Sequence, residues 1–102
     1  MKFKIITTTT DTHKIARNIA TTLVTKNLSP CVQIIPQVES IYNWLGRIEN
    51  SKEFLLIIKT TLGHVEECKN YILKLHNYDI PEIIVTEGEI LLDTYSDWFV
   101  GK

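Results

Sequence analysis

Residues 31–61 read CVQIIPQVESIYNWLGRIENSKEFLLIIKTT, and this stretch decides the fold. Two extended arms, residues 31–44 and 47–61, flank Gly46, which marks a turn. At ~3.3 Å per residue each arm reaches ~45 Å, whereas a domain of this size has a radius of gyration near ~13 Å. We therefore expect the outer half of the hairpin to overhang its sheet, with apolar side chains that a second copy of the chain covers. The alternative is a sharp bend at Pro36 that buries the tip against its own chain.

Working outward, the rest of the sequence predicts one strand before the hairpin and one after it, together with three helices. Period-two or continuous apolar patterns predict the strands, and apolar residues three and four apart predict the helices. The predicted strands cover residues 2–9 and 82–87, and the predicted helices cover residues 15–24, 65–75 and 91–99. Gly88 is expected to end the last strand.

This order, β-α-β-β-α-β plus a final helix, is typical of the ferredoxin-like arrangement. Right-handed crossovers then give an α+β fold in which both main helices cover one face of a four-stranded antiparallel sheet. No linker, repeat or low-complexity tract interrupts residues 1–102, so the sequence predicts a single domain.

The composition excludes several classes of protein. Eleven Lys and Arg face twelve Asp and Glu, and a net charge of −1 argues against nonspecific nucleic-acid binding. No apolar run approaches the ~18–20 residues of a membrane span, and no signal peptide is recognisable. Two cysteines, Cys31 and Cys68, are too few for a disulfide scaffold. We expect a cytoplasmic protein with no membrane or nucleic-acid partner.

The same topology occurs in RNA-recognition domains and in enzymes, and the sequence favours neither. An RNA-recognition domain stacks bases on aromatic residues of its central strands, whereas residues 54–58 read FLLII and are nearly all aliphatic. No nucleophile–base pair, metal-hydrolase spacing or glycosidase carboxylate pair is present. The chain is therefore not expected to be an enzyme.

Five segments, in this order and at this spacing, resemble the CutA family of divalent-ion tolerance proteins. They are LSPCVQIIP at 28–36, SIYNWLG at 40–46, residues 53–60, HNYDIPE at 76–82, and residues 95–98. The resemblance implies a ferredoxin-like subunit, an intertwined homotrimer, and a role in tolerance of divalent metal ions with copper binding. This chain departs from the family pattern with Ser29 and Pro30 before the cysteine, with Gln33 after it, and with Asn77 in place of a proline.

The resemblance also suggests metal ligands, because Cys31 matches the family cysteine. Thiolate and imidazole are good ligands for copper or zinc, so we consider Cys31 and His76, with Glu82 as a carboxylate ligand. No metal is expected to be required for folding. The structural alternative is that Cys31 is a small buried hydrophobe, that His76 ends a helix, and that Glu82 pairs with a cation. His64 and Cys68 share a helix face, but Cys68 falls on the apolar stripe and is expected to be core.

Aromatic and charged residues near the hairpin suggest a cleft or an interface. We expect the aromatic members to pack in the core or between subunits, except Tyr78, which forms with His76 and Glu82 a polar loop that suits a metal, an anion or a small effector. The two charged members are expected to face each other across a cleft or to be solvated. The set is Tyr42, Trp44, Glu53, Lys59, Tyr78, Tyr95 and Trp98. The sequence thus predicts a homotrimeric divalent-metal-binding protein. The alternative is a trimeric regulator, similar in architecture to PII signalling proteins, that binds an anion or small effector.

Overall fold

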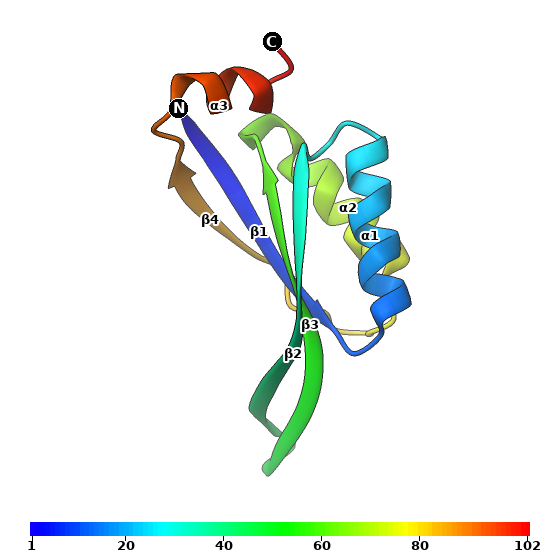
Figure 1. Cartoon of the computed structure of the whole chain (residues 1–102). Helices are drawn as coiled ribbons and strands as arrows, with labels where there is room; N and C mark the ends of the chain where they lie inside the picture. Colours follow the sequence, from blue (N-terminus) through cyan, green and yellow to red (C-terminus); the bar gives the residue numbers. More distant parts are fainter.

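The computed structural model, which describes residues 1–102, has the expected α+β class (Figure 1). Its elements are β1 (Lys2–Thr10), α1 (His13–Thr25), β2 (Cys31–Trp44), β3 (Arg47–Thr60), a 3-10 turn η1 (Leu62–His64), α2 (Val65–Leu75), β4 (Ile84–Glu89) and α3 (Asp93–Phe99). The strands form one sheet in the order β2-β3-β1-β4, and every neighbouring pair is antiparallel. No helix is long and apolar enough to cross a membrane.

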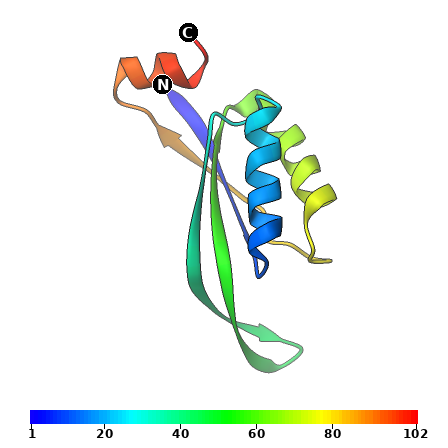
Figure 2. The same cartoon turned by 45° about the vertical axis from the view of Figure 1, so that its right-hand side comes forward.

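The core lies between the sheet and two helices, α1 and α2, which cover the same face (Figure 2). Alternate residues of β1 and β3 point toward the helices, and residues three and four apart on each helix meet them. The fully buried members are Ile6, Ala16, Ile19, Leu23, Leu56, Ile58, Cys68 and Ile72. Each buried Ile or Leu contributes ~1.5–3 kcal/mol, which makes this layer the main source of stability.

Neither α1 nor α2 covers the opposite face of the sheet, and α3 reaches it where Phe99 packs against Phe3, with ring centroids 5.5 Å apart. Ile84 is opposite Thr7, and Ile35 is opposite Leu55, so these residues share the uncovered face. Ile84 is 50% exposed and Ile35 is 42% exposed. A sheet face with exposed apolar side chains is a surface that suits a partner.

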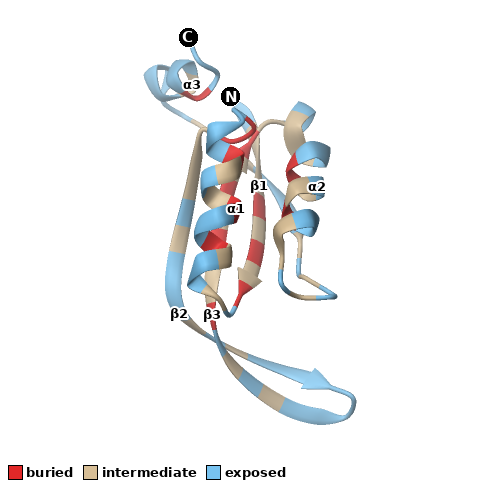
Figure 3. Cartoon of the chain, turned by 90° about the vertical axis from the view of Figure 1, so that its right-hand side faces the viewer, coloured by how far each residue is buried: buried red, intermediate tan, exposed pale blue.

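The β2–β3 hairpin overhangs the rest of the molecule, as its length predicts. β3 pairs with β1 only from Phe54 to Thr60, whereas it pairs with β2 up to the turn. Residues 38–53, here called the outer ribbon, therefore form a two-stranded projection beyond the helices (Figure 3), and the molecule measures 48 × 24 × 22 Å. The outer ribbon begins at an irregularity between Ile35 and Val38, where Gln37 has a φ of 59°.

The tip of the outer ribbon is exposed and apolar, so the alternative in which the chain buries its own tip is wrong. Trp44 is 52% exposed, Leu45 88% and Ile48 77%. Leu45 and Gly46 have φ values of 54° and 82°, which fits the left-handed two-residue turn that antiparallel strands prefer. Leucine is an unusual residue in that conformation, because its Cβ is crowded there.

The sequence misplaced the last strand and the last helix by about two residues each. β4 begins at Ile84 and runs through Gly88, which does not end the strand but lies opposite Phe3. The reason for glycine there is steric, because a Cβ at this position would lie 2.6 Å from Cε1 of Phe3. Helix α3 begins at Asp93, and Leu91 before it is 88% exposed.

Candidate functional site

The loop after α2 is tied to the end of β1 by His76. Nε2 of His76 lies 2.9 Å from the carbonyl oxygen of Thr9, and the backbone N–H of Tyr78 donates to Nδ1 at 3.0 Å. Because Nδ1 accepts a hydrogen bond, the proton lies on Nε2, which donates to Thr9. Burial lowers the pKa of His76 and outweighs the opposing effects of the Thr9 carbonyl and of the Glu53 and Asp11 charges. His76 is thus a neutral imidazole with both nitrogens engaged.

Tyr78 extends this network to the hairpin. Its hydroxyl donates to Oε2 of Glu53 at 2.6 Å, and its ring lies against His76 with centroids 4.9 Å apart. Burial and the bond to Glu53 raise the pKa of Tyr78 well above its ordinary range, so the phenol stays a donor. Glu53 is only 7% exposed. The base of the outer ribbon therefore contains a buried carboxylate held by a phenol.

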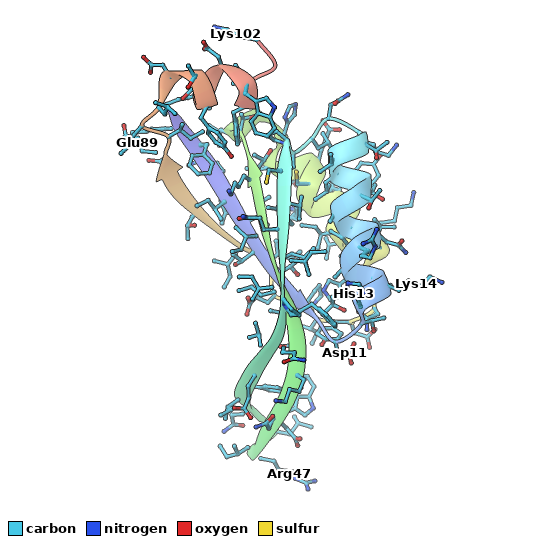
Figure 4. The ribbon with its side chains drawn as sticks, in the orientation of Figure 1. Asp11, His13, Lys14, Arg47, Glu89 and Lys102 are labelled. Carbon is cyan, nitrogen blue, oxygen red and sulfur yellow. The ribbon has the colours of Figure 1, made fainter.

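Asn77 fastens the same loop from the other side. The Thr10 hydroxyl donates to Asn77 Oδ1 at 2.6 Å, and Asn77 Nδ2 donates to Oδ1 of Asp11 at 2.9 Å. Asp11 lies where β1 ends, close to the point at which the outer ribbon leaves the sheet (Figure 4). Side-chain hydrogen bonds of Asn77 thus restrain the loop at the position where a proline was expected.

A cleft of about 950 Å³ lies between the outer ribbon and this loop. Its lining residues are Thr9, Ser40, Ile41, Tyr42, Trp44, Glu49, Glu53, Tyr78, Asp79, Ile80 and Glu82. Four of them are carboxylates and none is Lys, Arg or His, so the field inside the cleft is negative. We call this hollow the ribbon cleft.

Comparison with known proteins gives the family. The family model for the CutA1 divalent ion tolerance protein matches residues 4–102. The chain belongs to the CutA1 family. The divalent-cation tolerance protein CutA of Thermus thermophilus is 36% identical over 98 residues, which cover 93% of this chain and 92% of that protein. Mouse protein CutA is 37% identical over 86 residues, or 84% of this chain, and the match covers 49% of the mouse protein. The chain thus aligns with only about half the length of the mammalian relatives.

Solved CutA structures agree with the fold. The Thermus thermophilus protein has a TM-score of 0.89 at 34% identity, with 97% of this chain and 95% of that chain covered. CutA from Xylella fastidiosa has a TM-score of 0.90 at 33% identity, with coverage of 95% and 93%. CutA proteins are described by divalent-ion tolerance and not by a catalytic activity, so the prediction that the chain is not an enzyme is confirmed.

Within one CutA chain the three candidate metal ligands do not meet. Cys31 is opposite Lys59, which is opposite Ile5, whereas His76 bonds to Thr9. Four residues along a strand separate these positions by ~13 Å. Glu82 lines the ribbon cleft, whereas Cys31 does not. No group of three His, Cys, Asp or Glu side chains in the chain is placed to hold a metal ion. A site with all three ligands would need more than one chain.

The two cysteines differ in their surroundings. Cys31 is partly exposed at the start of β2, whereas Cys68 is fully buried on α2. Sγ of Cys68 lies 3.8 Å from the carbonyl oxygen of Leu28 and 3.9 Å from Oγ1 of Thr60, and burial raises the pKa of this thiol. Cys68 is therefore a core residue, as its apolar stripe predicts.

The predicted cleft residues divide into two groups. Tyr42, Trp44, Glu53 and Tyr78 line the ribbon cleft. Lys59 does not; it is six residues from Glu53 on one strand, ~20 Å away, and forms no ion pair with it. The remaining pair, on α3, is Tyr95 and Trp98, whose ring centroids are 5.4 Å apart.

Glu49 and Asp79 also line the ribbon cleft but were not among the predicted site residues. Asp79 lies inside the quoted HNYDIPE segment, so the motif itself was a signal for it. Glu49 lies directly opposite Tyr42 on the outer ribbon, so the pairing of the two arms about the turn at Gly46 was a signal for it.

Proposed function

We propose that this CutA protein is a cytoplasmic homotrimer that binds divalent metal ions, with copper as the principal ion. The observation that carries the proposal is the outer ribbon, which leaves apolar side chains and both strand edges without cover. Such a surface is unfavourable in an isolated chain and becomes favourable when identical chains cover one another. The number three comes from the family resemblance.

Assembly also bears on metal binding, because one chain does not bring the candidate ligands together. Cys31 has the soft, accessible thiol that copper prefers, and a reducing cytoplasm keeps it free. His76 has no free nitrogen, so it joins a metal only if the hydrogen bond from Tyr78 or the one to Thr9 breaks. We therefore centre the proposed metal site on Cys31, with further ligands from a neighbouring chain and with His76 and Glu82 as candidates.

The alternative of an anion-binding regulator receives less support. The ribbon cleft has four carboxylates and no basic residue among its lining. Lys4, a basic residue that could bind an anion, is already paired with Glu87 at 3.0 Å. A negative cleft repels a nucleotide or another anion.

The test is anaerobic titration of the metal-free protein with Cu⁺ and Cu²⁺ in separate experiments, followed by desalting and elemental analysis. The comparison is between wild type, Cys31→Ser and the matched control Cys68→Ser. We expect Cys31→Ser to lose bound copper while its mass by light scattering stays unchanged. Cys68→Ser should bind as much copper as wild type does, since the sulfur of Cys68 lies in the core.

His76→Ala tests whether His76 is one of the metal ligands, and we expect this variant, like Cys31→Ser, to leave the assembly intact. If Cys31→Ser binds as much copper as wild type does, the proposed metal site is wrong. Heat released on addition of nucleotides but not of copper would favour the regulator.

A further inference from the structure

The outer ribbon joins the rest of the chain at a hinge. The pairing of β2 with β3 is irregular between Ile35 and Val38, where two residues, Pro36 and Gln37, lie opposite Phe54 alone. At the same level β3 loses its other neighbour, because its pairing with β1 ends at Phe54. A sheet that narrows to two strands at a bulge resists bending weakly, and Figure 3 shows the outer ribbon curving away from the helices there.

A single side-chain interaction crosses this hinge. The Tyr78 hydroxyl donates to Oε2 of Glu53 at 2.6 Å, and Glu53 is the first residue of β3 beyond its pairing with β1. The other hydrogen bonds made by side chains of residues 38–53, those of Asn43 and of Asn50 with its partner, stay within the outer ribbon. No ion pair or ring contact joins the ribbon to the rest of the chain. The orientation of the ribbon therefore depends on this one bond.

The phenol at the other end of the bond is itself held in place. The backbone N–H of Tyr78 donates to Nδ1 of His76 at 3.0 Å, and the two rings are in contact. His76 in turn lies 2.9 Å from the carbonyl oxygen of Thr9, and Asn77 forms a further hydrogen bond to β1. Because the loop is anchored to β1 in two places, the bond from Tyr78 to Glu53 fixes the outer ribbon relative to the sheet.

We propose that the hydrogen bond between Tyr78 and Glu53 is a positioning device, which holds the outer ribbon in the orientation in which neighbouring copies of the chain cover it. The proposal rests on the proposed homotrimer. A ribbon that swings about its hinge loses this freedom on assembly, and the lost entropy weakens association, whereas a ribbon fixed beforehand avoids that loss. Stability alone does not favour Glu53, because a buried carboxylate is less favourable than an apolar residue of its size.

The experiment is a double-mutant cycle on the dissociation constant of the assembly, measured as weight-average mass over a dilution series of the full chain in one fixed concentration of urea. Tyr78→Phe removes only the hydroxyl, and Glu53→Met removes the acceptor while it keeps the length of the side chain. Each should raise the dissociation constant about tenfold, the usual effect of removing one hydrogen bond to a charged group. The double variant should raise it no further, because both changes remove the same bond.

Two control variants separate the hydrogen bond from other effects. Glu53→Gln removes the charge but keeps a carbonyl oxygen that accepts from the phenol, so its dissociation constant should lie closer to that of wild type than to that of Glu53→Met. Tyr71→Phe removes a phenol hydroxyl from α2, away from the outer ribbon, and should stay within twofold of wild type. The proposal is wrong if Tyr78→Phe dissociates as wild type does, or if the effects of the two single variants add.

A wild-type chain that stays monomeric at every concentration would refute the proposed homotrimer, and the positioning role would then be decided on the single chain. There the amide order parameters of residues 38–53, from nitrogen relaxation, should fall in Tyr78→Phe while those of β1 keep their wild-type values. Order parameters that do not change in the outer ribbon would overturn the positioning role as well.

Discussion

Trp44→Ala measures how much the outer ribbon contributes to assembly. Trp44 is 52% exposed in the single chain. A Trp side chain has on the order of 250 Å² of surface, so covering the exposed part buries ~130 Å². At ~25 cal/mol per Å² this burial is worth up to ~3 kcal/mol per chain. We therefore expect the dissociation constant of the assembly to rise by about two orders of magnitude for each Trp44 side chain removed from an interface.

The assay is the weight-average mass from light scattering and sedimentation over a dilution series. Leu73→Ala is the control, because Leu73 lies on α2, away from the outer ribbon, and is 51% exposed. We expect Leu73→Ala to follow the wild-type curve. A Trp44→Ala protein that follows the wild-type curve, together with a Cys31→Ser protein that dissociates, would reverse the roles assigned to these residues.

Two further predictions concern stability. Because burial lowers the pKa of His76 below its ordinary 6.5, the unfolded chain binds more protons than the folded one as the pH falls below that value. The free energy of unfolding of the wild type should thus be full above pH 6.5 and decrease below it. Denaturant unfolding at matched protein concentrations should show a smaller decrease for His76→Gln, and an equal decrease in the two proteins would disprove this role for His76. Gly88→Ala should lower stability by about 1–3 kcal/mol, because its Cβ would meet the Phe3 ring at 2.6 Å. Gly63→Ala, where nothing lies within 4 Å, is the control in thermal denaturation, and a Gly88→Ala melting temperature at or above wild type would contradict the steric argument.

Strand and helix order could be predicted because the chain follows simple periodicities. The length of the hairpin arms against the size of the domain also predicted the overhang, and Pro36 indicated where the strand becomes irregular. Gly88 was misread because a glycine in a strand has two meanings, a break or a close approach of another side chain. Only the position of Phe3 on the neighbouring strand distinguishes them.

The candidate site was less accessible to prediction, for reasons that are spatial. The motif HNYDIPE correctly indicated a polar loop, but the hydrogen bonds that engage both nitrogens of His76 depend on β1 lying beside that loop. Glu53 looked like a partner for Lys59, because both point to one face of a strand. The two residues lie too far apart along β3 to pair, and Glu53 instead accepts a hydrogen bond from Tyr78.

The most direct test of the proposed assembly is the mass of the purified wild-type chain in solution at micromolar concentration, by light scattering coupled to size exclusion. The proposed trimer predicts a mass about three times the 11.8 kDa of one chain. A stable species of 11.8 kDa would mean that the ribbon needs no partner, and it would contradict the proposed trimer.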